Sequence, residues 1–191
     1  MQRIGLILSG GAGVRMGGAD KGALRLGGAR LIDRVAERLH AQTERLLISG
    51  RHDYGLGLPF IPDRADGPAG PAAGLWAALC WLNDNGVKAD GLLTAPADGP
   101  FVPLDLAENL CSAEASAVAC HSGEMHPTFA WWRVRDLETI FAGLKPGDAP
   151  SLKSLCEQAK ARRTPFEDAD AFFNVNTPDD LARAETLLAA R

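Results

Sequence analysis

The sequence predicts an α/β fold of three layers, in which helices cover both faces of a mostly parallel mixed sheet. Short apolar runs alternate with segments of helical periodicity, and this alternation is typical of βαβ crossovers. The first apolar run leads directly into a glycine-rich segment, an arrangement that suits anion binding where a strand ends. With 191 residues, 46% of them hydrophobic, the chain is large enough for one core, so we expect a single domain over residues 1–191.

In the first half of the chain, strands and helices alternate. Residues 4–8 form a short, β-branched apolar run that suits a buried parallel strand. Leu31, Val35 and Leu39 recur at helical spacing, and Pro103 can open a helix because its missing N–H is not needed there. In order, we expect strands at 4–8, 46–49, 58–61 and 91–95, helices at 31–42 and 75–86, and a short helix from Pro103.

The second half is less regular. The last helix has the clearest start, with Thr177 as N-cap, Pro178 at its first position and acidic residues in its first turn. Repeats, low-complexity runs and linkers are absent from the sequence, which again favours one domain. The remaining expected elements are strands at 116–120, 128–134 and 172–175 and helices at 135–145 and 151–162.

Composition narrows the classes of function. A net charge of −4 is a poor match to general nucleic-acid binding, and no apolar run is long enough to span a membrane. The four cysteines include no C-x-x-C pair, which fits reduced thiols in the cytoplasm, where we expect the protein. Residues 1–40 carry seven basic and three acidic side chains, a local +4 that suits a small anionic ligand. For Arg30, Arg34 and Arg38 we expect instead a solvated helix stripe, which leaves Arg15 and Lys21 as the candidates for ligand binding.

The glycine-rich segment has the strongest functional signal. Its glycines let a ligand approach the backbone closely, and successive N–H groups in such a loop can converge on an anion. Arg15 and Lys21 add positive charge to it. The P-loop pattern is absent, and the dinucleotide pattern G-x-G-x-x-G has Met16 in place of its third glycine. We therefore expect a nucleotide phosphate site of another kind, with a flexible surface loop as the alternative.

Polar residues follow three of the predicted strands. Asp98 lies between Pro96 and Pro100, where a carboxylate could hold Mg²⁺ or could simply form a turn with Gly99. Asp63 could hydrogen-bond the N–H groups of a nucleotide base, support the metal or cap the next loop, and Ser49 ends another strand. Because the carboxyl ends of parallel strands meet at one edge of a sheet, we expect these residues near the glycine-rich segment.

Residues 8–17 read L-S-G-G-A-G-V-R-M-G and are followed by D-K-G at 20–22. This pattern resembles the nucleotidyltransferase signature L-x-G-G-x-x-x-R-M-G, and in particular the molybdenum cofactor guanylyltransferases (molybdopterin-guanine dinucleotide biosynthesis protein A family). N-V-N-T-P at 174–178 is similar to the motif near that family's C-terminal end. The chain departs from the family pattern at Ser9, where Ala is usual, at Ser49, where Asn is frequent, and near Lys153, where arginines often occur.

The resemblance implies a Rossmann-like nucleotide-binding fold and transfer of GMP from GTP to the terminal phosphate of Mo-molybdopterin, with pyrophosphate released and Mg²⁺ as cofactor. The N-terminal half would bind nucleotide and the C-terminal half the cofactor substrate, and contacts with cofactor-synthesis and molybdoenzyme-delivery proteins would be transient. Alternatives are a CTP-dependent molybdopterin cytidylyltransferase, a sugar-phosphate nucleotidyltransferase and a non-catalytic nucleotide-binding adaptor.

The resemblance also implies which residues form the site. Those for the nucleotide are Leu8, Ser9, Gly10, Gly11, Lys21, Ser49, Asp63 and Asp98. Those for the acceptor are Arg15, Gly18, Asn174 and Asn176, while Arg15, Lys21 and Asp98 act in catalysis and Asp98 holds the metal. The absence of a recognisable catalytic histidine arrangement is no obstacle, because an acceptor phosphate monoester is already ionised, with a second pKa of about 6.

Overall fold

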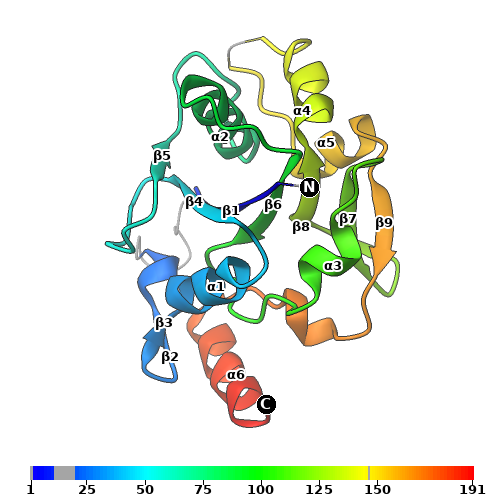
Figure 1. Cartoon of the computed structure of the whole chain (residues 1–191). Coiled ribbons are helices and arrows are strands. Elements are labelled where there is room, and N and C mark those ends of the chain that lie inside the picture. The colour runs from blue at the N-terminus through cyan, green and yellow to red at the C-terminus, as the bar shows by residue number, and fades with distance from the viewer. Residues whose placement is uncertain (1, 11–19, 146) are drawn as a thin grey trace.

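The computed structural model describes residues 2–10, 20–145 and 147–191, and in these a seven-stranded sheet of order β5-β4-β1-β6-β8-β7-β9 forms the centre of the molecule (Figure 1). Strand β8 runs antiparallel to β6 and β7, and the other pairings are parallel. The predicted mostly parallel mixed sheet is therefore confirmed. Its strands are β1 (Arg3–Ser9), β4 (Arg45–Gly50), β5 (Phe60–Pro62), β6 (Gly91–Pro96), β7 (Ala117–His121), β8 (Glu124–Arg133) and β9 (Arg162–Pro165).

Helices cover both faces of this sheet (Figure 1). Helices α2 (Ala72–Asp84), α4 (Val134–Phe141) and α5 (Leu152–Gln158) share one core with it, and α1 (Leu31–His40) and α3 (Leu106–Leu110) share the other. Helix α1 buries a single apolar stripe, as an amphipathic surface helix does. Helix α6 (Pro178–Ala189) packs with the small hairpin of β2 (Arg25–Leu26) and β3 (Ala29–Arg30) in a third cluster.

The order of the strands creates a crevice above β1. The chain passes from β1 through α1 to β4 and β5 on one side, and α2 then carries it back to β6 on the other side. Leu8 of β1 pairs with Ser49 of β4 and with Pro96 of β6, so the three strands end at the same level. Ligands in open α/β sheets bind where the connections diverge in this way.

Most predicted elements are present, but α3 begins at Leu106 rather than at Pro103, α4 ends at Phe141 rather than at 145, and the second half needs three further corrections. Strand β8 begins at Glu124 rather than at 128, so residues 124–127 belong to the β7–β8 hairpin. The helix expected to reach 162 ends at Gln158, and residues 162–165 form β9. The strand expected at 172–175 is wrong: a 3-10 turn, η3 (Ala169–Phe172), occupies its start. Phe172 stacks on His126 at 4.4 Å, so this apolar residue is buried by ring packing rather than by strand pairing.

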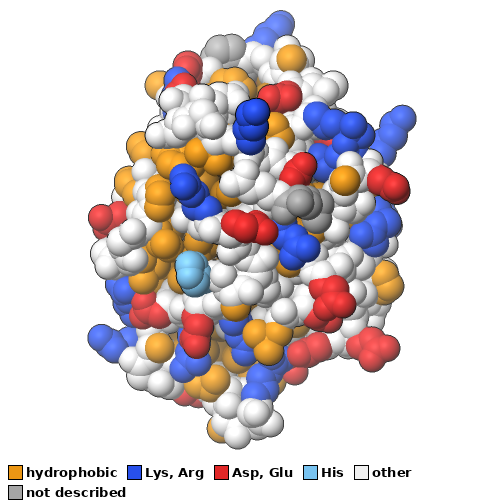
Figure 2. Space-filling view, in the orientation of Figure 1, with side chains coloured by type: hydrophobic (Ala, Val, Ile, Leu, Met, Phe, Trp, Pro, Cys, Tyr) orange, Lys and Arg blue, Asp and Glu red, His pale blue; other side chains and the backbone are white. Residues whose placement is uncertain are grey.

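The face of the molecule drawn in Figure 2 carries side chains of mixed character. Figure 2 shows hydrophobic side chains gathered on the left of the view, over the region of β4 and β5, with acidic and basic side chains interspersed over the rest. Such interspersed charge is ordinary for a solvated surface. Among the described residues, no helix combines the length and the apolar character needed to cross a bilayer.

Candidate active site

A cavity of about 460 Å³ lies at the carboxyl ends of β1, β4 and β6. Its walls come from both halves of the chain, as expected for a crevice where connections diverge. The residues lining it are Leu8, Ser9, Gly10, Asp20, Lys21, Gly22, Ser49, Tyr54, Asp63, Gly70, Pro71, Gly74, Pro96, Ala97, Asp98, Thr128, Leu152 and Asn174.

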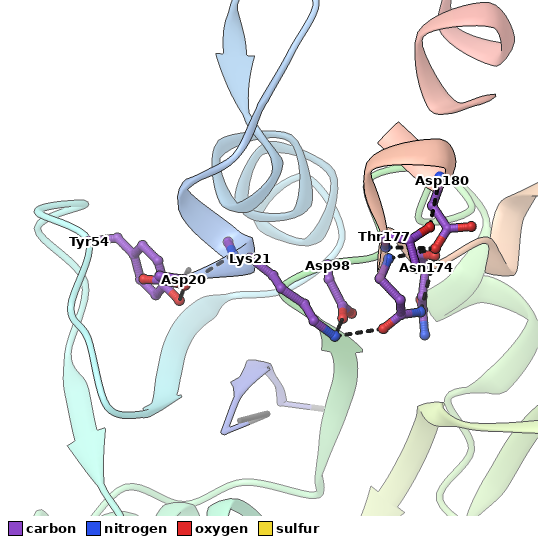
Figure 3. A network of polar contacts seen from close by, with 9 residues as sticks. Asp20, Lys21, Tyr54, Asp98, Asn174, Thr177 and Asp180 are labelled. Carbon is purple, nitrogen blue, oxygen red and sulfur yellow. Dashed lines mark hydrogen bonds and ion pairs between the residues drawn. The ribbon is translucent and has the colours of Figure 1, made fainter. Parts of the chain in front are cut away.

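Lys21 and Asp98 face each other in this cavity (Figure 3). The Lys21 Nζ lies 3.3 Å from Asp98 Oδ2 and donates a hydrogen bond of 2.6 Å to Asn176 Oδ1. The Lys21 and Asp98 side chains are each 19% exposed. Burial raises the pKa of Asp98 above its usual value, and the Lys21 ammonium partly offsets this effect. The pair therefore places one acidic and one basic side chain, both largely shielded from water, in direct contact within the crevice.

The backbone explains why Asp98 points into the cavity. The Ala97 N–H donates to the Leu8 carbonyl at 3.0 Å, which continues the β1–β6 pairing one residue beyond β6. The Gly99 N–H then donates to the Pro96 carbonyl at 3.2 Å and closes a turn around Asp98. This turn directs the carboxylate into the cavity. Asp98 therefore both forms the turn and belongs to the site.

The asparagine segment reaches the site through the start of α6. Thr177 Oγ1 accepts a hydrogen bond of 3.1 Å from the Asp180 N–H, and Asp180 Oδ2 accepts bonds of 2.9 Å from the N–H groups of Asn176 and Thr177. This capping box confirms the predicted helix start. The Asn174 Oδ1 is buried and has no hydrogen-bond partner among the described residues. A buried amide oxygen of this kind is suited to accept a hydrogen bond from a ligand.

Ser49 forms the wall of the cavity from inside the sheet. The residue is 1% exposed, and its hydroxyl donates to the Ile7 carbonyl at 3.4 Å. A Cβ at Gly74 would lie only 2.6 Å from Ser49 Oγ, so α2 can approach β4 here because residue 74 is glycine. Ser9 Oγ donates to the Ser49 carbonyl at 2.9 Å. Asp63, by contrast, is exposed just after β5 and reaches the cavity from its rim.

The predicted site residues that the structure describes lie together around this cavity. Gly11, Arg15 and Gly18 lie outside the described residues. Tyr54, Asp20 and Thr128 line the cavity but were not predicted, and Tyr54 has no motif or periodicity around it that could have indicated it. The predicted residues that line the cavity are Leu8, Ser9, Gly10, Lys21, Ser49, Asp63, Asp98 and Asn174, and Asn176 joins them through Lys21.

The donor set of this cavity fits a metal that arrives with a substrate. Across residues 2–10, 20–145 and 147–191, histidine, cysteine and acidic side chains do not gather in groups of three or more that could form a cage. Asp98 supplies a single shielded carboxylate. Mg²⁺ keeps several waters and binds through one or two carboxylates together with substrate phosphates. Asp98 could therefore hold Mg²⁺ with phosphate oxygens completing the coordination.

The fold and the cavity together define a class of protein, the nucleotidyltransferases built on a single α/β domain. Residues 5–163 match the model of the MobA-like NTP transferase domain. The structure is also similar to that of molybdopterin-guanine dinucleotide biosynthesis protein A from Archaeoglobus fulgidus, with a TM-score of 0.73, 24% identity and 100% of each chain covered.

Two relatives carry the comparison to a particular family. The chain is 47% identical to the molybdenum cofactor guanylyltransferase of Cereibacter sphaeroides over 194 residues, covering 98% of each sequence. It is 36% identical to the protein of that name from Mesorhizobium japonicum over 198 residues, covering 96% of this chain and 95% of the relative. The chain belongs to the molybdenum cofactor guanylyltransferase family.

Proposed function

We propose that this protein transfers GMP from GTP to the terminal phosphate of Mo-molybdopterin. An oxygen of the acceptor phosphate forms a bond to the α-phosphorus of GTP, the bond from that phosphorus to the oxygen bridging to the β-phosphate breaks, and pyrophosphate leaves. Membership of the family supports the reaction. The observation that carries it for this chain is the cavity in which Lys21, from the turn after the glycine-rich segment, and Asp98, just beyond the end of β6, face each other with Nζ and Oδ2 3.3 Å apart.

In this proposal the nucleotide lies along the ends of β1 and β4. The backbone from Leu8 to Gly10 follows the phosphates, where N–H groups can face anionic oxygens. Lys21 neutralises charge that develops on the phosphates as pyrophosphate leaves. Ser49 and Asp63 lie on the guanine side, and the exposed carboxylate of Asp63 can accept hydrogen bonds from guanine N–H groups.

Asp98 would hold Mg²⁺, which when bound neutralises phosphate charge and orients the triphosphate. The acceptor enters from the side of Asn174 and Asn176, and Arg15 and Gly18, which lie outside the described residues, are further contacts that we propose for it. The unpartnered Asn174 Oδ1 supports this assignment, because a pterin ring offers N–H donors. The acceptor phosphate is already ionised at neutral pH, so positioning and charge neutralisation suffice without a protein base.

The reaction is tested by supplying Mo-molybdopterin with GTP, CTP or ATP in the presence of Mg²⁺. We expect pyrophosphate release and a guanine dinucleotide product with GTP. A clear preference for CTP would assign the chain to cytidylyl transfer instead, and nucleotide binding without pyrophosphate release would indicate an adaptor. Omission of Mg²⁺ tests the metal requirement. The proposal also includes a cytoplasmic location and transient contacts with the proteins that supply and receive the cofactor.

A further inference from the structure

Tyr54 reaches the active-site cavity from a segment outside the regular elements. It lies in the connection between β4 and β5, and its partly buried ring lines the cavity and packs into the core on the α1 side of the sheet. His52 meets this ring edge-on at 6.1 Å. Such packing fixes the direction in which the phenol hydroxyl points.

The Tyr54 hydroxyl is bound to the turn that carries Lys21 (Figure 3). It donates a hydrogen bond of 2.7 Å to Asp20 Oδ1, and the same oxygen accepts a bond of 3.1 Å from the Gly22 N–H. The Tyr54 hydroxyl and the Gly22 N–H therefore hold the same carboxylate oxygen of Asp20, the residue next to Lys21. Burial raises the pKa of Tyr54, so the hydroxyl keeps its proton and remains a donor throughout the neutral range.

The turn itself has little internal support. It is a 3-10 helix, η2, of three residues (Lys21–Ala23), with backbone bonds of 3.2 Å from the Ala23 N–H to the Asp20 carbonyl and 3.0 Å from the Leu24 N–H to the Lys21 carbonyl. Short 3-10 turns have poor hydrogen-bond geometry and depend on their surroundings. The side chain of Asp20 and its bond from Tyr54 provide that support.

Neighbouring residues accommodate both the hydroxyl and the backbone of Tyr54. A Cβ at Gly22 would lie 2.8 Å from the Tyr54 hydroxyl oxygen, so the close contact requires glycine at 22. The backbone of Tyr54 has φ +55°, a left-handed conformation that non-glycine residues keep only where their surroundings hold them. Arg30 supplies that hold, since its Nη1 donates to the Tyr54 carbonyl at 2.8 Å while Asp33 fixes its guanidinium.

We propose that Tyr54 is the positioning residue for Lys21. Through Asp20 it fixes the turn from which Lys21 reaches Asp98 and Asn176, and so it sets where the ammonium meets the phosphates. The inference rests on the proposed function only in what Lys21 does to the nucleotide. The placement of Lys21 by Tyr54 can be tested separately from the reaction.

The test is Tyr54→Phe, which removes the hydroxyl and keeps the ring. We expect kcat to fall between about 10- and 100-fold, since small misplacements of a charged group are that costly, while the KM for GTP changes much less. Asp20→Ala should reproduce the loss, and Asp53→Ala is the matched control. Asp53 lies in the same connection and accepts a bond from the Gly55 N–H, but it does not line the cavity.

A double-mutant cycle separates positioning from general packing. In the Lys21→Met background, adding Tyr54→Phe should lower the remaining kcat by less than about twofold, because two changes that act through one group are not additive. If the two substitutions lowered kcat independently, so that their effects multiplied, the proposal would be overturned. A Tyr54→Phe enzyme with wild-type kcat would overturn it as well.

A crystal structure of Tyr54→Phe gives a reading that does not depend on turnover. We expect the Lys21 Nζ to leave hydrogen-bond range of Asn176 and Asp98, and an unmoved Lys21 would refute the role of Tyr54. A wild-type protein that transfers no nucleotide would refute the proposed function alone, since the position of Lys21 could still be compared between the two structures.

Discussion

The Lys21 ammonium lies 3.3 Å from the Asp98 carboxylate, although 77 positions separate the two residues in the sequence. Lys21 comes from the first turn after the glycine-rich segment, and Asp98 from the turn after β6. In the absence of nucleotide the lysine supplies the positive charge that a buried carboxylate needs. A divalent cation bound by Asp98 would face that same ammonium, so the two cations repel each other unless phosphate groups lie between them.

We therefore predict that Lys21→Met binds Mg²⁺ more tightly than the wild type does when nucleotide is absent. Removing a neighbouring positive charge from a shielded site should raise the affinity by about tenfold or more. Calorimetric titration with MgCl₂ measures this change. Lys21→Arg, which keeps the charge, is the matched control and should bind Mg²⁺ as weakly as the wild type. Equal affinities in all three proteins would show that Lys21 and the metal do not compete.

Asp98→Asn should remove turnover while leaving the fold intact. The amide keeps the shape of the side chain but loses the charge that would hold Mg²⁺. We expect a fall in kcat of about 100-fold or more, which corresponds to about 2.7 kcal/mol. Far-ultraviolet circular dichroism checks the fold. Asp105→Asn, a neutralised carboxylate outside the cavity whose partner is Asn109, should retain wild-type rates. If Asp98→Asn also kept the wild-type rate, Asp98 would have no part in the mechanism.

The sequence predicts the site well where a motif and a strand end coincide. Leu8, Ser49, Asp63 and Asp98 each follow or end a strand, so parallel pairing alone brings them to one edge. Tyr54 could not be predicted in this way. It lies in an irregular connection, and its role depends on the glycine at 22, far from it in sequence.

The errors in the predicted fold also arise where the local sequence does not reveal how a segment packs. The segment 172–175 is rich in apolar, β-prone residues, but the Phe172 ring packs against His126, Phe129 and Phe166, and the segment does not pair in the sheet. Strand β9 was missed because its residues are Arg162–Pro165, of which only Thr164 is buried. An edge strand exposed along most of its length lacks the apolar pattern from which strands are predicted.

Gly74→Ala should destabilise the protein because α2 packs directly on β4 at this point. The added Cβ would lie 2.6 Å from Ser49 Oγ and 3.3 Å from Leu8 Cδ2, so the side chains of the cavity wall would have to move. We expect a loss of about 1–3 kcal/mol in the free energy of unfolding, measured by urea denaturation. Adding Ser49→Ala removes the closer contact and should recover part of the loss. No recovery in the double variant would mean that the strain arises elsewhere.

Thr177→Ala should weaken the attachment of α6. The Thr177 hydroxyl caps the Asp180 N–H, and loss of an N-cap side chain of this kind costs about 1 kcal/mol. Thermal unfolding measures the change in stability. Thr186→Ala, a hydroxyl removed from the same helix whose only bond is to the Ala182 carbonyl among the described residues, should cost less. Equal losses would argue against the cap as the source.

The capping box also makes the start of α6 dependent on pH. Burial alone would raise the pKa of Asp180, but the hydrogen bonds from the N–H groups of Asn176 and Thr177 outweigh it and hold the pKa below the usual 3.8. A carboxylate whose pKa is lowered on folding adds stability above its unfolded pKa, and this contribution disappears as the pH falls through the lowered value.

Asp180→Asn, which cannot ionise, should therefore lower stability at neutral pH, and its difference from the wild type should shrink below about pH 4. Urea denaturation of both proteins between pH 3 and pH 7 measures the difference. A gap that stayed constant over this range would show that the charge of Asp180 does not stabilise the segment carrying Asn176.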